Sequence, residues 1–491
     1  MTSYALTKRP FTRPALFLIT AVLLLLATLL WQLLAAPAAP PPAPALAGRD
    51  RIVGTTITDL QARVAQNPND AEGYAMLGLA YLQQVRETAD ANYYGLAEQA
   101  FNEALSREPQ QFQAVLGQGI LALARHDFQQ GLVWGEQAST LNPYSAEALG
   151  VLVDANVELG RYETAVSTAQ QMVNLRPNLA SYSRIAYLRE LHGDVDGAIV
   201  AMGQAAQAGA PGQEDTLWTL VQLGNLYLNR GEWGEATAVY QQALQSRPDY
   251  PFAQAGLARV QAAQGNVAGA IETFEQLVGR LPLPEFAITL GELYLATDQP
   301  EKAQAQFDLV HLIQQLNADA GMDVDLELAL FEANHGDPAQ AVRLATAAYD
   351  RRPSIYAADA LSWSLYKNGD PEAAWPYAQE ALHLGTQDAM LHFHAGMIAQ
   401  RLGRTADAQT HPGQALALNA TFSIPAILSL TKANGSDGEV GCGLMVTNGR
   451  FLQPPRPLSN PATAQCKQTA VSDTSVKKSK PTVSHTGANQ R

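Results

Sequence analysis

The sequence predicts an all-α fold, a superhelical solenoid of about ten helix–turn–helix repeats, preceded by one transmembrane helix and followed by a disordered tail. Three observations predict it. A pattern of small and apolar residues recurs about every 34 residues through the middle of the chain. A long uncharged apolar run stands near the N-terminus. The helical pattern stops after Ser423, where the composition changes abruptly.

The first element is the apolar run Ala15–Ala36, which follows three basic residues and carries no charge. About 20 apolar residues suffice to cross a bilayer, and a signal-peptide core is usually shorter. We therefore expect an uncleaved signal-anchor that contacts the lipid bilayer. The basic residues would hold residues 1–14 in the cytoplasm and place the rest of the chain outside. Cleavage near residues 35–39, which would release a secreted protein, is the alternative.

The anchor is followed by a linker rich in proline and alanine at residues 37–51, and then by the solenoid at residues 52–423. The clearest repeat is Leu217–Tyr250, where two runs of apolar and small residues at helical spacing flank Gly231 and end at Pro248. Glycine adopts the positive φ of a tight turn at little cost, and proline cannot continue a helix interior. One hairpin cannot bury its own apolar face, so copies should stack on both sides of it.

The other copies can be aligned on this one, and a lone helix near Thr58–Gln66 should cap the array. The first repeat has about seven residues more than the 34-residue period, and we expect them to form a longer loop around Arg86–Tyr93. The second helix of the seventh repeat should continue to about Asn317. Pro412 stands inside the second helix of the tenth repeat, where it should kink or break that helix.

This pattern resembles the tetratricopeptide repeat (TPR) superfamily over residues 52–423. Residues 184–194, 323–337, 352–370 and 384–403 resemble, more narrowly, bacterial membrane-associated TPR proteins of unassigned function. The resemblance implies a solenoid that binds other proteins or extended peptides in a bacterial cell envelope. It implies no catalytic activity.

Charge is spread unevenly over the 491 residues, whose net charge is −14 at pH 7. Residues 1–50 carry +3 and residues 424–491 carry +5, which leaves −22 on residues 51–423. A body this acidic repels nucleic acid, so we expect no nucleic-acid partner. The only cysteines, Cys442 and Cys466, follow the solenoid, so no disulfide can staple its repeats.

The tail at residues 424–491 is rich in Gly, Ser, Pro and Thr and holds five lysines, whereas the solenoid holds only Lys302 and Lys367. Such a composition predicts disorder. A change of reading frame in the gene is the alternative explanation for so abrupt a shift.

Motifs that would indicate catalysis, a cofactor or a metal are weak. Gly117–Ala122 matches a loose dinucleotide fingerprint but lies within a predicted helix and follows no strand. Asp323–Glu327 mimics the start of a calcium loop without its glycine. His392 and His394 are two residues apart on a helix and point to different faces. We therefore expect no catalytic residue, no cofactor, no metal site and no enzyme activity.

The resemblance places a protein-binding groove on the first helix of each repeat, at its second, fifth, ninth and twelfth positions. The groove residues implied in this chain are Tyr187, Trp218, Asn225, Arg259, Tyr356, Trp363, Tyr366 and Phe393. Aromatic side chains are enriched at binding surfaces, although the same residues could pack between repeats. Asn225 matches one element of the clamp by which some TPR domains hold a terminal carboxylate, but Val221 replaces its usual lysine partner.

The sequence thus predicts a membrane-anchored TPR scaffold for protein–protein or protein–peptide interactions in the cell envelope. Two alternatives remain open. One is a regulator or sensor that binds a small ligand in the TPR groove. The other is an accessory subunit of an envelope enzyme or transporter.

Overall fold

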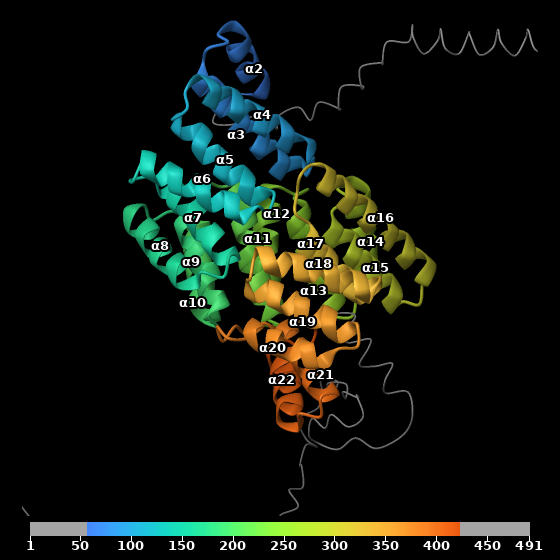
Figure 1. The fold of residues 1–491 in the computed structure, drawn as a ribbon. Helices are drawn as coiled ribbons and strands as arrows, with labels where there is room; N and C mark the ends of the chain where they lie inside the picture. The colour runs from blue at the N-terminus through green and yellow to red at the C-terminus, as the bar shows by residue number, and fades with distance from the viewer. Residues whose placement is uncertain (1–55, 423–491) are drawn as a thin grey trace, which may run out of the picture. The chain divides into compact units, whose positions relative to one another are not determined.

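The structure, a computed structural model, describes residues 56–422, and every regular element within them is an α-helix (Figure 1). Among the described residues, 60–422 belong to one compact unit, and the contacts below lie within it. The predicted segments 1–14, 15–36, 37–51 and 424–491 lie outside the described residues. Among residues 56–422, no helix combines the length and the apolar character needed to cross a membrane.

Helix α2 (Ile57–Gln66) precedes ten successive hairpins, as the repeat pattern predicts. The hairpins are α3 (Ala71–Thr88) with α4 (Asn92–Arg107), α5 (Phe112–Ala124) with α6 (Phe128–Leu141), α7 (Ala146–Glu158) with α8 (Tyr162–Leu175), α9 (Leu179–Leu191) with α10 (Val195–Ala208), α11 (Glu214–Asn229) with α12 (Trp233–Ser246), α13 (Pro251–Ala263) with α14 (Val267–Arg280), α15 (Pro284–Ala296) with α16 (Pro300–Asp319), α17 (Asp325–His335) with α18 (Pro338–Arg351), α19 (Ile355–Lys367) with α20 (Pro371–Ala381), and α21 (Ala389–Arg401) with α22 (Thr405–Leu418).

Helix starts and turns follow local chemistry. Six hairpin helices begin after an aspartate whose carboxylate accepts backbone N–H groups of the first turn, and five begin with proline at the first or second helical position. Most hairpin turns contain a glycine with positive φ, as predicted at Gly231. His126 and Asp298 take the left-handed conformation in the turns of the second and seventh repeats.

The distance between neighbouring hairpins is set by an aromatic ring in the best-formed repeats. Tyr240 of α12 is fully buried, and its ring lies against Gly224 of α11 and Gly256 of α13. A Cβ atom at either glycine would overlap the ring. We call this arrangement, an aromatic ring held between small residues of two first helices, the glycine socket. It lets three helices approach more closely than larger residues would allow.

The same socket recurs in the first repeat, where Phe101 of α4 lies against Gly78 and Gly117. In the tenth repeat Pro412 takes the place of the aromatic residue, and its ring packs against Gly396. Helix α22 continues through Pro412, so the predicted break does not occur. The socket holds the proline ring in place, although proline supplies no backbone N–H to the helix.

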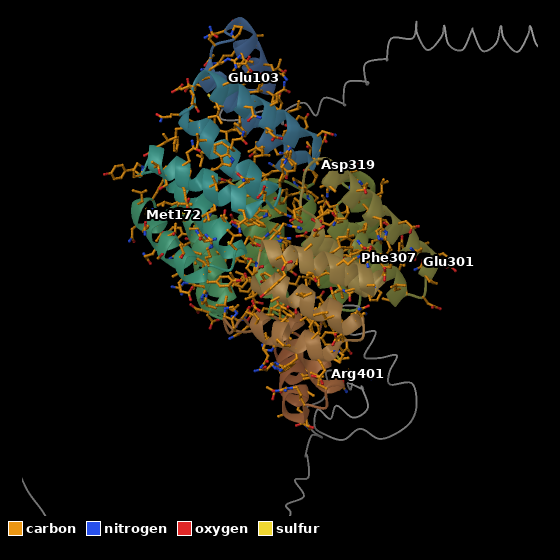
Figure 2. The ribbon with its side chains drawn as sticks, viewed as in Figure 1. Glu103, Met172, Glu301, Phe307, Asp319 and Arg401 are labelled. Atoms are coloured by element: carbon orange, nitrogen blue, oxygen red, sulfur yellow. The ribbon has the colours of Figure 1, made fainter. Side chains whose placement is uncertain are left out.

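The two predictions about repeat length had different outcomes. The longer loop around Arg86–Tyr93 is wrong, because α3 continues to Thr88 and α4 already begins at Asn92. The additional residues lengthen the helices, and the Tyr81 and Tyr93 rings meet at 5.8 Å across the short connection. The long second helix of the seventh repeat is confirmed. Helix α16 has 20 residues, and Glu301 and Asp319 mark its two ends in Figure 2.

The solenoid closes on itself through contacts between residues more than 190 positions apart. On one side of each contact is the turn within a hairpin or the helix end beside that turn. On the other side is the loop that follows the hairpin five repeats later. The contacts are His126 Nδ1–H to the Asp323 carbonyl at 2.9 Å, the Ile355 N–H to the Tyr162 hydroxyl at 2.8 Å, Gly193 against the Gly385 carbonyl, and the Asn419 side-chain N–H to the Leu228 carbonyl at 3.0 Å. We call this line of contacts the seam. It means that a second superhelical turn rests directly on the first, with α8 and α9 packed against α19 and α20.

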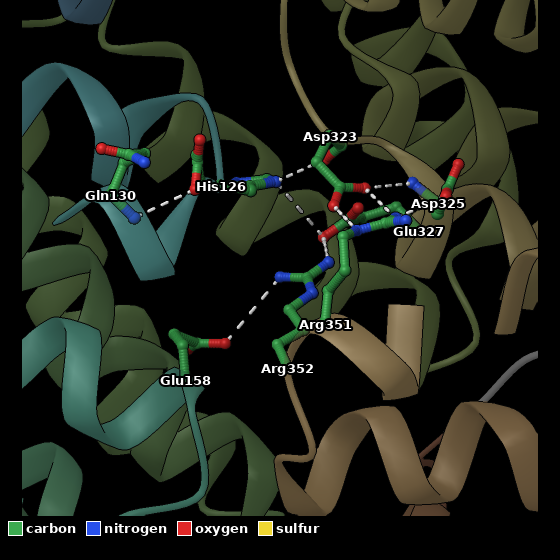
Figure 3. Close-up of polar contacts among 9 residues, drawn as sticks. His126, Gln130, Glu158, Asp323, Asp325, Glu327, Arg351 and Arg352 are labelled. Carbon is green, nitrogen blue, oxygen red and sulfur yellow. Dashed lines mark hydrogen bonds and ion pairs between the residues drawn. The ribbon is translucent and has the colours of Figure 1, made fainter. Parts of the chain in front are cut away.

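Ion pairs between charged residues stabilise the seam at its N-terminal end (Figure 3). Arg352 is 3% exposed and lies 3.8 Å from Glu158 of the first superhelical turn and 3.4 Å from Glu327 of the second. Its guanidinium also lies 5.3 Å from the centroid of the Phe128 ring. Burial raises the pKa of Glu158, and Arg352 opposes that rise. Because the buried charge of Arg352 is balanced only when acids of both superhelical turns lie beside it, this residue favours one arrangement of the two turns.

The glycine socket can be tested by filling it. Gly224→Ala should lower the free energy of unfolding by about 1–3 kcal/mol, because the new methyl group overlaps a ring that has no room to move. Urea denaturation followed by circular dichroism measures the change. Gly234→Ala on α12 is the matched control, since no atom lies within 4 Å of a Cβ there, and it should be neutral or stabilising by up to about 1 kcal/mol. Equal effects of the two substitutions would contradict the socket.

Candidate functional site

A cavity of about 1060 Å³ lies on the inner side of the solenoid. The first helices of five successive repeats, α7, α9, α11, α13 and α15, form its near wall. Met390 of α21 and residues 419–422 form its far wall. The seam brings this far wall into place, because the Asn419 side chain donates to the last-turn carbonyl of Leu228 on α11. The concave face therefore forms a partly open cavity in its central part.

Four of the eight predicted groove residues line this cavity, namely Tyr187, Trp218, Asn225 and Arg259. Trp218 is 44% exposed, which is unusual for so large an apolar side chain. A fifth, Tyr356, lines a smaller adjoining cavity of about 210 Å³. The structure thus brings these five residues, from four different first helices, to one region.

The other three predicted groove residues line neither cavity and pack against one another. The ring centroids of Trp363 and Tyr366 are 5.0 Å apart, and those of Trp363 and Phe393 are 6.0 Å apart. Trp363 and Phe393 are each 6% exposed, and the Trp363 indole N–H donates to Asn334. Little of the Trp363 and Phe393 side chains is left to contact a partner, and Tyr366 is half-buried.

Asn225 connects the glycine socket to the cavity wall. The Tyr240 hydroxyl donates to Asn225 Oδ1 at 2.7 Å, and the Asn225 side-chain N–H reaches Gln222 Oε1 at 3.4 Å. Burial raises the pKa of the Tyr240 hydroxyl, which therefore stays protonated and remains a donor. The carboxamide is held in one orientation, with its N–H group toward Gln222 and the cavity.

Six charged side chains line the cavity, and four of them are paired within the protein. Arg184 pairs with Asp154 at 2.6 Å, Glu158 lies 3.8 Å from Arg352, and Glu292 lies 3.2 Å from His335. Glu190 and Arg259 are different. Within residues 56–422, neither side chain forms a hydrogen bond or an ion pair.

Glu190 stands where the two cavities meet and lines both. Burial, reinforced by the nearby carboxylate of Asp388, raises the pKa of Glu190 to about 7. Asp388 caps α21 by accepting the N–H groups of Met390 and Leu391. At neutral pH, Glu190 is therefore divided between its neutral and its ionised form.

Part of the repeat region is similar to known proteins and to one family model. The family model described as "Tetratricopeptide repeat" matches residues 221–283. The curated protein "Cellulose synthase operon protein C" of Pseudomonas fluorescens (strain SBW25) is 23% identical over 303 residues, which are 58% of this chain and 24% of that protein. This chain thus spans about a quarter of the length of the relative it matches.

Solved structures are similar to this chain at low sequence identity. The human IFIT1 dimer with PPP-AAAA has a TM-score of 0.43 and 18% identity, covering 67% of this chain and 77% of that chain. The crystal structure of YrrB, whose title describes a TPR protein with an unusual peptide-binding site, has a TM-score of 0.25 and 16% identity, covering 40% of this chain and 97% of that chain.

The unpaired Glu190 predicts a pH-dependent stability. The folded protein holds the proton of Glu190 up to about pH 7, whereas an ordinary glutamate has a pKa of 4.5. This group's contribution to the free energy of unfolding is therefore full below pH 4.5 and falls as the pH rises to about 7. Glu190→Gln stays neutral, so it should be more stable than the wild type by roughly 1–3 kcal/mol at pH 8 and equally stable at pH 4.

Urea midpoints at the two pH values measure this difference. Glu235→Gln, on the exposed face of α12, is the matched control and should show no such pH-dependent gain. A Glu190→Gln variant whose stability follows the wild type at both pH values would contradict the assignment.

Proposed function

We propose that this chain, a member of the tetratricopeptide repeat superfamily, is a scaffold that binds extended segments of other proteins in the cavity of its concave face. The observation that carries the proposal is the composition of the α11 wall. Trp218 presents a large exposed ring, and Gln222, Asn225 and Asn229 present amide groups beside it. An extended backbone offers N–H and C=O groups for such amides, and its side chains can pack on the ring.

The scaffold is proposed to be anchored in a membrane of the cell envelope by Ala15–Ala36, with its solenoid on the extracytoplasmic side. The length of this uncharged run, the basic residues before it and the proline-rich linker after it support this topology. A secreted form made by cleavage near residues 35–39 is the alternative.

A second candidate, a regulator that binds a small ligand in the same cavity, is favoured by the cavity's size. Its volume of about 1060 Å³ is just above the roughly 300–1,000 Å³ that is typical of ligand sites. An accessory subunit of an envelope enzyme is a special case of the scaffold. The operon in the relative's printed name makes a polysaccharide synthase one enzyme to test as a partner.

Partner capture through the cavity can be tested at Trp218. A photoreactive benzoyl-phenylalanine at position 218 should cross-link a segment of the partner, and Trp218→Ala should weaken its binding about tenfold or more. Tyr144 is the matched control position, because it is 81% exposed and does not line the cavity. Cross-links of equal yield from both positions, or undiminished binding by Trp218→Ala, would rule out this cavity as the partner site.

The proposed topology predicts which side of the membrane the solenoid occupies. External protease added to spheroplasts of the source cell should degrade residues 52–423 while a cytoplasmic marker protein survives. Immunoblotting with an antibody to the solenoid measures the loss. A solenoid that survives in intact spheroplasts and is degraded only after lysis would overturn the outward orientation.

A further inference from the structure

The charges of the concave cavity are balanced except at two positions. The pairs that involve Arg184, Glu158 and Glu292 engage four of its six charged side chains from within the protein. Glu190 of α9 and Arg259 of α13 face the same cavity without a hydrogen bond or ion pair among residues 56–422, although Arg259 lies near the buried Glu285 of α15 and opposes the rise that burial causes in the pKa of that carboxyl group. The other four charged side chains that line the cavity are paired within the protein, so Glu190 and Arg259 are the two at which a ligand can supply a direct partner.

We propose that the cavity selects an extended peptide of bipolar charge, with a cationic group at Glu190 and a carboxylate at Arg259. This inference rests on the proposed function and names the class of segment that the scaffold binds. The cation is a basic side chain or a free amino terminus. The carboxylate is an acidic side chain or a free carboxyl terminus.

Electrostatics and geometry both favour such a ligand. A partly buried charge without a partner is costly, and an opposite charge on the ligand recovers that cost on binding. The guanidinium of Arg259 presents a planar fork of donors that suits a carboxylate. Glu190, once ionised, accepts hydrogen bonds from an ammonium or guanidinium group.

The arrangement of the helices sets the spacing between the two charges of the ligand. Helix α11 lies between α9 and α13 in the wall, and packed helices are about 8–10 Å apart. Glu190 and Arg259 are therefore separated by on the order of 20 Å, which an extended chain crosses in about six residues. The amides of Gln222 and Asn225 lie on the helix between them and can bind the intervening backbone.

Binding should also depend on pH in a definite direction. The groups that face Glu190 are Asp388 at the start of α21, Tyr187 on its own helix, Tyr356 on α19, and Arg230 at the end of α11. Arg230 is already paired with acids of its own neighbourhood, and burial raises the pKa of both tyrosines, which stay neutral. Glu190, with a pKa of about 7, must lose its proton to bind a cation. Affinity for a basic ligand should therefore rise about tenfold from pH 6 to pH 8.

The test is an array of immobilised peptides of about nine residues, long enough to cross both sites, probed with the full-length protein. One set varies Lys and Glu positions between blocked ends, and a second set has free ends. The expected result is selective capture of peptides with a basic and an acidic group about four to six residues apart. Preference for internal charges in the blocked set identifies side chains as the ligand groups, whereas capture only in the free-end set identifies termini.

Substitutions then assign each charge to its site. Arg259→Gln should weaken binding of the bipolar peptides about ten- to hundredfold and abolish selection for the acidic group. Glu190→Gln should abolish selection for the basic group and remove the pH dependence. Arg343→Gln and Glu235→Gln, on exposed helix faces away from the cavity, are the matched controls and should change neither. The double variant Glu190→Lys with Arg259→Glu should prefer peptides with the reversed order of charges.

The possible failures are distinguishable. Peptides captured in the cavity without a charge preference, or with a preference that all variants retain, would overturn the bipolar assignment and leave the scaffold function intact. Capture of no peptide by a folded wild-type protein, as judged by circular dichroism, would overturn the scaffold function together with this inference.

Discussion

The ring of Tyr240, enclosed between Gly224 and Gly256, is the contact on which the rest of the architecture depends. It fixes how closely one hairpin approaches the next. In a solenoid each repeat touches mainly its neighbours, so a small rotation between neighbours accumulates along the array. Here the accumulated rotation returns the chain to itself after five hairpins. The same small set of residue types, an aromatic ring against glycine, therefore determines both local packing and long-range closure.

Closure changes the concave face from an open groove into a cavity. The turn of one hairpin meets the loop five repeats later, and Asn419 and the residues after it become the far wall. Arg352 makes this closure specific, because its buried charge requires acids from both superhelical turns. An arrangement of the two turns that separated Arg352 from either acid would leave a charge buried without its partner, which is costly.

The sequence predicted those features of the fold that the spacing of residues within one repeat determines. Helix existence, the length of α16 and the cavity positions on α9, α11 and α13 all follow from the register of one repeat. Two expectations drawn from local sequence were wrong. Helix α22 does not break at Pro412, because Gly396 accommodates the proline ring. The additional residues around Arg86–Tyr93 extend the helices and form no longer loop. The seam and the far wall were beyond prediction, because they depend on rotation summed over five repeats. For the same reason the sequence could not distinguish Trp218, which stays exposed, from Trp363, which is buried.

The cavity wall is rigid, and it carries two charged side chains that form no ion pair within residues 56–422. Asn225 is held by the Tyr240 hydroxyl, so the surface beside Trp218 is anchored directly to the core. On this fixed surface Glu190 and Arg259 remain unpaired, and burial of Glu190 costs the folded protein stability that a glutamine would recover. A protein selected for stability alone would pair or neutralise such groups. They face the concave cavity, and the other four charged side chains that line it are paired, which is the physical reason to assign Glu190 and Arg259 to recognition.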